Sequence, residues 1–157
     1  MAFNYSILLL PIRAAQAVFA LIVLGTLAYA AHEINNVPFA SSPSWINFLL
    51  FCAVWTLLAL VYLLLAPIWF PALAHKLAIL GVDALTMIFW FAGFVATAVK
   101  LDNTDCGSYG PCKATVAGDV FGAFEWVLFA ITTALALLEG RSAFGRGSRK
   151  NANDVAI

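Results

Sequence analysis

Charged side chains are scarce in this chain of 157 residues. Eight Lys and Arg together with eight Asp and Glu make up 10% of the sequence, while hydrophobic residues make up 64%. Ordinary soluble domains carry about 25% charged and about 45–50% apolar residues. So few charges cannot cover the surface of a water-soluble globule, and the mean hydropathy of +0.96 agrees. The composition therefore excludes an ordinary soluble domain.

Histidine and cysteine are also few, with two His and three Cys in the whole chain. The sequence contains no His/Cys cluster with metal-ligand spacing, no Gly-rich phosphate loop and no Ser/His/Asp arrangement. We therefore predict that the chain is not an enzyme and has no cofactor, no metal and no catalytic residue. Its basic C-terminal run contains few aromatic residues and follows directly on an apolar segment, so it does not indicate nucleic-acid binding.

Long apolar runs, in contrast, occupy most of the chain. About 20 apolar residues at ~1.5 Å rise each cross a ~30 Å hydrocarbon core as a helix. We therefore predict an all-α membrane protein with four transmembrane helices in an up-and-down bundle. The predicted helices cover about residues 7–31, 45–66, 77–99 and 118–138.

These four helices form a single predicted domain over residues 1–140, followed by a basic, disordered cytoplasmic tail over residues 141–157. A secretory signal is a competing interpretation of the first apolar run, with Ala14–Leu27 as its hydrophobic region. We favour a retained helix, because no basic segment precedes the apolar run Ile7–Leu10, and Arg13 and Gln16 interrupt what would be a short hydrophobic region.

The distribution of Lys and Arg predicts the orientation of the bundle. If both termini are cytoplasmic, six of the eight Lys and Arg lie on the cytoplasmic side and two on the other side. The six are Arg13, Lys76, Arg141, Arg146, Arg149 and Lys150, and the two are Lys100 and Lys113. Because cytoplasmic segments carry an excess of these residues, we predict that both termini are cytoplasmic.

Two of the cysteines flank a short segment containing Gly and Pro on the side predicted to be non-cytoplasmic. Cys106 and Cys112 lie where thiols can oxidise, so we predict a disulfide that pins the hairpin between the third and fourth helices. A loop this small contributes only about 2 kcal/mol. Two free thiols are the alternative. A metal half-site is disfavoured, because no His or further Cys lies nearby and Cys52 falls inside the second helix.

Ionisable residues inside the bilayer are the candidate functional groups. Arg13 and Asp83 lie at similar depths, about 9 Å from the cytoplasmic surface, which predicts a buried ion pair. Glu125 enters from the opposite side and lies about 10 Å below the outer surface, too far along the normal to reach Asp83. The candidate partners of Glu125 at its own depth are Trp90, Thr97, Cys52 and Trp55, or its own proton.

These carboxylates have two interpretations. They can be buried polar groups that set the rotation of the helices, or they can form an ion or proton path. We favour the structural interpretation, because Glu125 shares a helix face with small residues such as Gly118 and Gly122.

The tail carries the last group of candidate residues. Cations near an anionic leaflet contribute about 1 kcal/mol each. We therefore predict contact with lipid headgroups, although the same cations can act simply as the stop that follows the fourth helix. The residues concerned are Arg141, Arg146, Arg149 and Lys150.

Several strings in the chain resemble those of fungal MARVEL-domain membrane proteins, and the similarity covers about residues 5–140. The strings are Asp83-Ala84-Leu85-Thr86, Phe89-Trp90-Phe91-Ala92-Gly93, the pair Cys106 and Cys112, and Phe121-Gly122-Ala123-Phe124-Glu125-Trp126. The segment Gly140–Ser148 also resembles the end of the non-classical export protein branch, whose members associate with eisosomes in the plasma membrane. The resemblance implies a four-helix bundle with cytoplasmic termini and no known enzymatic activity.

The resemblance also implies a function. We expect an integral protein that organises plasma-membrane microdomains, associates with itself as a homo-oligomer and contacts lipids, including anionic lipids and sphingolipid or sterol, with a role in lipid sensing or traffic. The alternative from another class is a small ion or proton conductor, or a transporter subunit, that uses Asp83 and Glu125.

Overall fold

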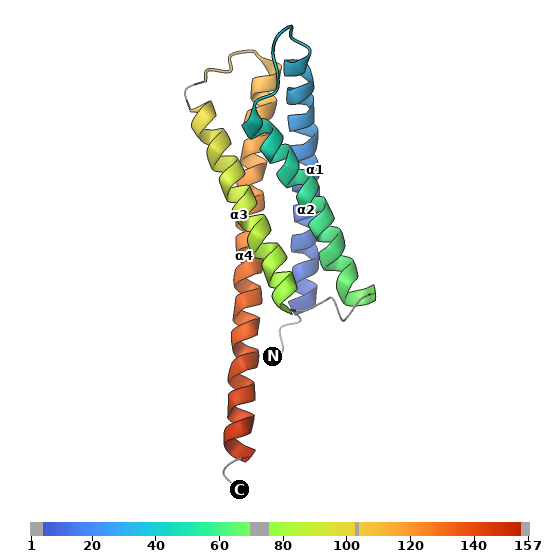
Figure 1. Ribbon diagram of the computed structural model, residues 1–157, viewed down its shortest axis with the longest axis vertical. Coiled ribbons are helices and arrows are strands. Elements are labelled where there is room, and N and C mark those ends of the chain that lie inside the picture. The colour runs from blue at the N-terminus through green and yellow to red at the C-terminus, as the bar shows by residue number, and fades with distance from the viewer. Residues whose placement is uncertain (1–4, 70–75, 103, 155–157) are drawn as a thin grey trace.

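The computed structural model contains four helices in the described part of the chain, and no strand is found there (Figure 1). They are α1 (Tyr5–Asn35), α2 (Ser44–Trp69), α3 (Lys76–Leu101) and α4 (Gly110–Asp154). The structure describes the backbone of residues 5–69, 76–102 and 104–154, and the side chains of residues 9–65, 77–102 and 104–138. The prediction of an all-α, four-helix membrane fold is confirmed.

The helices run alternately up and down (Figure 1). The start of α1, the end of α2 and the start of α3 lie at one end of the bundle, and α4 projects beyond that end. The other end, which we call the loop end, carries the connections 36–43 and 102–109. Helix α1 packs against α2 and α4, and α3 packs against the same two helices. The helices therefore form a ring in which α1 and α3 are diagonal neighbours.

The exterior of the bundle is apolar along all four helices. Large aliphatic side chains are exposed on every helix, for example Leu21, Leu58, Ile88 and Ile131. Each helix is long and apolar enough to cross a membrane. Polar side chains such as Gln16, Thr56 and Thr97 are buried in the interior instead. This is the distribution expected of a bundle whose surroundings are lipid rather than water.

Small residues allow the helices to approach one another closely. A Cβ atom at Gly118 would lie 2.8 Å from Leu27 Cδ2 on α1, and one at Gly93 would lie 2.7 Å from Leu49 Cδ2 on α2. Real Cβ atoms essentially never approach other atoms this closely, so a larger residue at either position would force the leucine side chain to shift. Close approach through small residues is a main source of helix association in lipid, where no hydrophobic force acts between helices.

Helix α4 differs from its predicted boundaries at both ends. It begins at Gly110 rather than near residue 118, with Pro111 in its first turn, where the missing N–H group is harmless. The prediction followed the apolar run, whereas a helix needs only its backbone hydrogen bonds and can continue into the interface. The helix also continues to Asp154, where we predicted a disordered tail. No proline follows Pro111, and the Arg, Ala and Lys residues of the extension favour helix.

Candidate functional site

A salt bridge inside the bundle joins the two diagonal helices α1 and α3. Arg13 Nη1 donates to Asp83 Oδ1 at 2.7 Å, and Arg13 Nη2 donates to Asp83 Oδ2 at 2.6 Å. The two side chains are only 7% and 1% exposed. The geometry is bidentate, which suits the planar guanidinium group and strengthens the pair. The structure thus brings together the two residues that matched depth had placed in one layer.

Two further residues extend this pair into a network. Gln16 lies one turn after Arg13 on α1, and its Oε1 accepts a hydrogen bond from Arg13 Nη1 at 3.1 Å. The ring of Phe129 on α4 lies 6.0 Å from Arg13 Cζ, within the range of a cation–π interaction. Neither residue was predicted from the sequence to belong to this site. The i, i+3 spacing of Arg13 and Gln16 was a usable signal for Gln16, whereas nothing local marks Phe129.

Tryptophan and threonine side chains connect α2 to α3. Trp55 Nε1 donates to Thr86 Oγ1 at 3.0 Å, and Trp90 Nε1 donates to Thr56 Oγ1 at 2.8 Å. The two bonds run in opposite directions between the helices, one from each tryptophan. Each satisfies an indole N–H that would otherwise be unpaired in an apolar interior. Together they define the register of α2 against α3.

The four side chains predicted as candidate partners of Glu125 are therefore engaged elsewhere, and the alternative that Glu125 keeps its own proton stays a prediction. Besides the two tryptophans, Cys52 Sγ donates to the carbonyl of Phe89, and Thr97 Oγ1 donates to the carbonyl of Gly93. The prediction treated depth as sufficient, but an indole N–H has one proton and the threonines of the adjacent helix accept it. Which side chain reaches that proton depends on helix rotation, which depth does not specify.

Glu125 is fully buried between α4 and α1. Its carboxyl group lies near the backbone of Ala20 without hydrogen-bond geometry, and neither oxygen has a hydrogen-bond partner among the described residues. The Nε2 atom of Gln16, one turn below Ala20, likewise has no partner in the described part of the chain. Asp83 is held by Arg13 instead, so the structure does not join Asp83 to Glu125.

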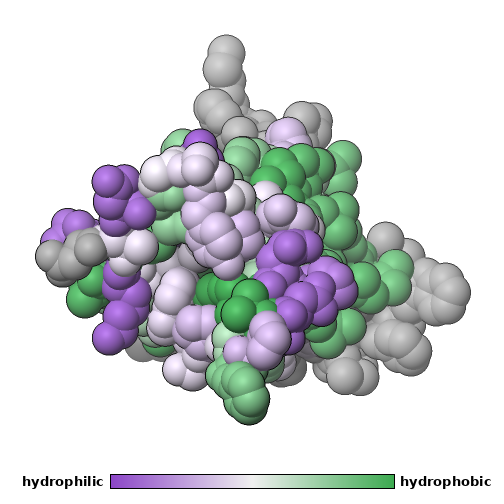
Figure 2. Space-filling model, turned by 90° about the horizontal axis from the view of Figure 1, so that it is seen from above, coloured by the Kyte–Doolittle hydropathy of each residue, from purple (hydrophilic) through white to green (hydrophobic). Residues whose placement is uncertain are grey.

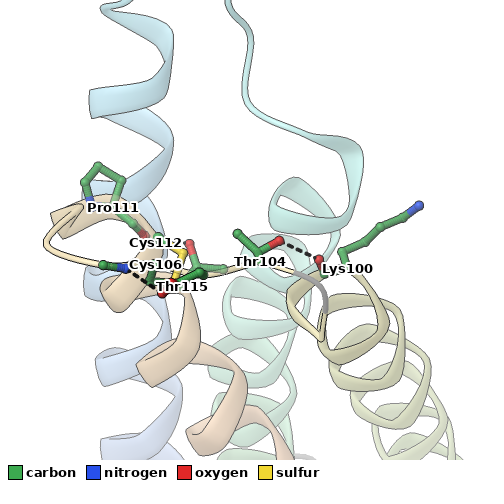
Figure 3. Close-up of a disulfide and its surroundings, with 8 residues drawn as sticks. Lys100, Thr104, Cys106, Pro111, Cys112 and Thr115 are labelled. Atoms are coloured by element: carbon green, nitrogen blue, oxygen red, sulfur yellow. Dashed lines mark hydrogen bonds between the residues drawn. A yellow bond between two sulfur atoms is a disulfide. The ribbon is translucent and has the colours of Figure 1, made fainter.

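The loop end is closed by a disulfide between Cys106 and Cys112, whose Cα atoms are 5.4 Å apart (Figure 3). The bond ties the α3–α4 connection to the first turn of α4. Within the connection, Gly107 N donates to Asp105 Oδ1 at 3.1 Å, and Gly107 adopts a positive φ of 46° that favours glycine. Cys52 is a buried free thiol. The described residues contain no group of His, Cys, Asp and Glu that could hold a metal ion.

A pocket of about 200 Å³ lies beside this disulfide, between the ends of α1 and α3 and the beginnings of α2 and α4. Its wall is mostly apolar, with Lys100 and Asp105 as its charged members. The lining residues are Ile34, Pro43, Trp45, Ile46, Lys100, Leu101, Thr104, Asp105, Cys106, Tyr109, Pro111, Cys112 and Thr115. Figure 2 views the loop end, where hydrophilic residues form separate groups with hydrophobic residues between them. This pocket is not predicted from the sequence, because its wall comes from segments distant in the chain.

The tail cations Arg141, Arg146, Arg149 and Lys150 lie on the helical extension of α4. This extension projects past the other three helices at the end opposite to the loop end (Figure 1). The side chains of these residues fall outside the described ones. Their contact with lipid headgroups therefore stays a prediction.

The four-span bundle with its buried polar groups agrees with a comparison against known protein families. Residues 6–135 match MARVEL, the membrane-associating domain. The chain belongs to the MARVEL family. Comparison with curated proteins and with solved structures finds no significant match. MARVEL is a membrane-associating structural family and not an enzyme family, and this MARVEL protein is an integral membrane protein.

Proposed function

We propose that this MARVEL protein organises microdomains of the plasma membrane as a lipid-associated, self-associating structural component. The observation that carries the proposal is the distribution of polar and apolar side chains between the interior and the exterior of the bundle. Arg13, Asp83 and the Trp–Thr pairs are bonded inside the bundle, while the outer faces of all four helices present apolar side chains. The largest surface that the protein offers to partners is therefore the one that faces lipid and neighbouring membrane proteins.

The proposal includes the orientation and the tail. Both termini are cytoplasmic, so the basic extension of α4 projects from the anionic inner leaflet and its four cations attract lipid headgroups. The uneven distribution of Lys and Arg supports this orientation. Tags at either end should be accessible only after permeabilisation of cells. Asn4, which begins an Asn4-Tyr5-Ser6 glycosylation sequon, should carry no glycan.

The finer assignment is a role in eisosome-like, furrow-forming domains of fungal plasma membranes, with sensing of sphingolipid or sterol surroundings or a part in traffic. The resemblance of segment Gly140–Ser148 to the non-classical export branch supports this assignment. Imaging of the tagged protein in fungal cells tests it. Localisation in stable patches that disperse when sphingolipid or sterol synthesis is inhibited supports the assignment, and a uniform distribution contradicts it.

The test of the general function is extraction of the protein in native lipid without detergent. Native mass spectrometry of the extracted particles should show a homo-oligomer with a lipid composition that differs from that of the bulk membrane. A monomer surrounded by lipid of bulk composition would contradict both self-association and lipid organisation. The measurement needs no knowledge of the lipid in advance.

The alternative function is proton or ion conduction through Glu125, and one observation favours it. Glu125 is a buried carboxyl group without a hydrogen-bond partner among the described residues. Asp83 does not continue a path from it, because Arg13 binds both of its carboxylate oxygens. Proteoliposomes containing wild type and Glu125→Gln at equal folded amount decide between the two functions. A flux that wild type supports and the variant abolishes would establish conduction.

A further inference from the structure

The pocket at the loop end combines four features that suit one kind of ligand. Its lining is mostly apolar and includes two aromatic residues, Trp45 and Tyr109, one acidic residue, Asp105, and one basic residue, Lys100. Cations are attracted to the faces of aromatic rings. Quaternary ammonium groups suit aromatic pockets well, because they carry a permanent positive charge and their methyl groups are apolar. A carboxylate at the same wall adds to this attraction.

The volume of the pocket limits the size of the ligand. About 200 Å³ is less than the ~300 Å³ at which pockets for drug-sized ligands begin. It is more than the ~150 Å³ cavity that holds benzene. A trimethylammonium group is similar in size to benzene. The pocket can therefore enclose such a group but not a whole lipid or a sterol.

The direction of the Lys100 side chain indicates where an anionic group of the ligand would bind. The carbonyl of Lys100 accepts a hydrogen bond from Thr104 Oγ1 next to the disulfide, while the ammonium group extends away from the disulfide (Figure 3). An anion bound to this ammonium group would lie outside the pocket. A ligand that fits both charges therefore has a cationic end inside and an anionic group outside, a short distance along the same molecule.

The position of the pocket in the membrane indicates which molecules can reach it. The four apolar spans end at Asn35 and Leu101 and begin at Ser44 and Gly110, and these are the helix ends around the pocket. The pocket therefore lies at the level of the lipid headgroups. The molecules that surround its opening are membrane lipids, and among their headgroups phosphocholine has a quaternary ammonium group next to a phosphate.

From the juxtaposition of Trp45, Tyr109, Asp105 and Lys100 at the headgroup level, we propose that this pocket binds the phosphocholine headgroup of a membrane lipid. The trimethylammonium group lies inside, against the two aromatic side chains and the Asp105 carboxylate. The phosphate lies outside at Lys100, and the acyl chains follow the apolar exterior of the bundle. The proposal rests on the proposed lipid-associated function and specifies the headgroup for it. The Cys106–Cys112 disulfide forms part of the wall and holds the segment that carries Asp105 and Tyr109 in place.

The first experiment uses the wild-type protein. It is purified in a maltoside detergent, which contains no choline, and titrated with dihexanoyl phosphocholine, phosphoethanolamine and phosphoglycerol below their micelle concentrations. Calorimetry should show binding of the phosphocholine lipid at least about fivefold tighter than that of the other two, corresponding to a cation–π contribution of about 1 kcal/mol. Equal binding of all three lipids, or no binding of the phosphocholine lipid, would overturn the proposal.

Paired variants then locate the site. Asp105→Asn keeps the acceptor for Gly107 N but removes the charge, and Trp45→Leu removes an aromatic face. Each should weaken phosphocholine binding about fivefold or more. Asp102→Asn, in the same connection but outside the pocket wall, and Trp126→Leu, which contacts Phe91 and Phe94 instead, should bind like wild type. Unchanged binding by both test variants, each with its helical circular dichroism intact, would show that phosphocholine binds elsewhere.

The outcome is separable from that of the proposed function. If native particles hold an oligomer with selected lipids but the purified protein shows no preference for phosphocholine, this proposal fails and the proposed function stands. If the particles hold a monomer in bulk lipid and no short-chain lipid binds, both fail. Retention of phosphocholine lipids by the particles, together with the fivefold preference in the titration, supports both.

Discussion

Removal of the Asp83 carboxylate tests the intramembrane network most directly. Asp83→Ala leaves the Arg13 guanidinium buried at 7% exposure, with Gln16 Oε1 and the face of Phe129 as its described partners. Two charge-assisted hydrogen bonds of 2.7 and 2.6 Å are lost, and no described acid takes their place. Breaking a buried ion pair in this way costs about 3–5 kcal/mol. The equilibrium between folded and unfolded protein should therefore shift by more than about a hundredfold.

The assay is reversible unfolding in mixed micelles of mild detergent and dodecyl sulfate, followed by circular dichroism. A double-mutant cycle with Asp83→Ala, Arg13→Ala and the double variant separates the pair from its surroundings. The single changes should each cost several kcal/mol, and the double change should cost much less than their sum, because no lone charge stays buried. Replacement of both residues by leucine or methionine should be close to neutral. The charge swap Arg13→Asp with Asp83→Arg should recover part of the stability that each swapped residue loses alone.

A control at an exposed carboxylate calibrates the result. Asp102→Asn changes a carboxylate in the α3–α4 connection and should alter stability by less than about 0.5 kcal/mol. If Asp83→Ala behaves like this control, or if the single costs add in the double variant, then Arg13 and Asp83 do not form a coupled pair in the membrane. Either result would refute the reasoning from matched depth and bidentate geometry.

Three further predictions concern other parts of the bundle. Glu125→Gln keeps the shape of a side chain that has no hydrogen-bond partner among the described residues, so stability in the same assay should change by less than about 1 kcal/mol; a loss of several kcal/mol would mean that the charge itself is needed. Gly118→Ala places a Cβ atom 2.8 Å from Leu27 Cδ2 and should cost about 1–3 kcal/mol, whereas a Cβ atom at Gly25 meets no atom of the described residues within 4 Å, so Gly25→Ala should be neutral or stabilising; equal effects of the two changes would argue against close packing of α1 on α4. Mass spectrometry without reductant should recover Cys106 and Cys112 in one linked peptide, and recovery of both as alkylated thiols from fresh membranes would exclude the disulfide.

The sequence predicts a property correctly where that property depends on length or on distance along a helix axis. Four apolar runs of sufficient length predict four spans, because the bilayer thickness and the rise per residue are both constant. The same count predicts that Arg13 and Asp83 share a layer. In contrast, depth did not identify which side chains bond to one another. Trp55 and Trp90, two of the candidates for Glu125, donate to Thr86 and Thr56 instead, because these pairings depend on the rotation of each helix.

By itself, then, the sequence determined that this protein lies in the membrane, how many times it crosses, and at what depth its charges lie. Only the tertiary structure decided that α1 and α3 are diagonal neighbours joined by the ion pair, and that Trp55 and Trp90 donate to threonines rather than to Glu125. It also decided that a pocket lined by one acidic and one basic residue lies at the loop end. The physical reason is that depth follows from a single helix, whereas neighbours and pockets arise where several helices meet. Their relative rotations depend on the packing of all four helices at once.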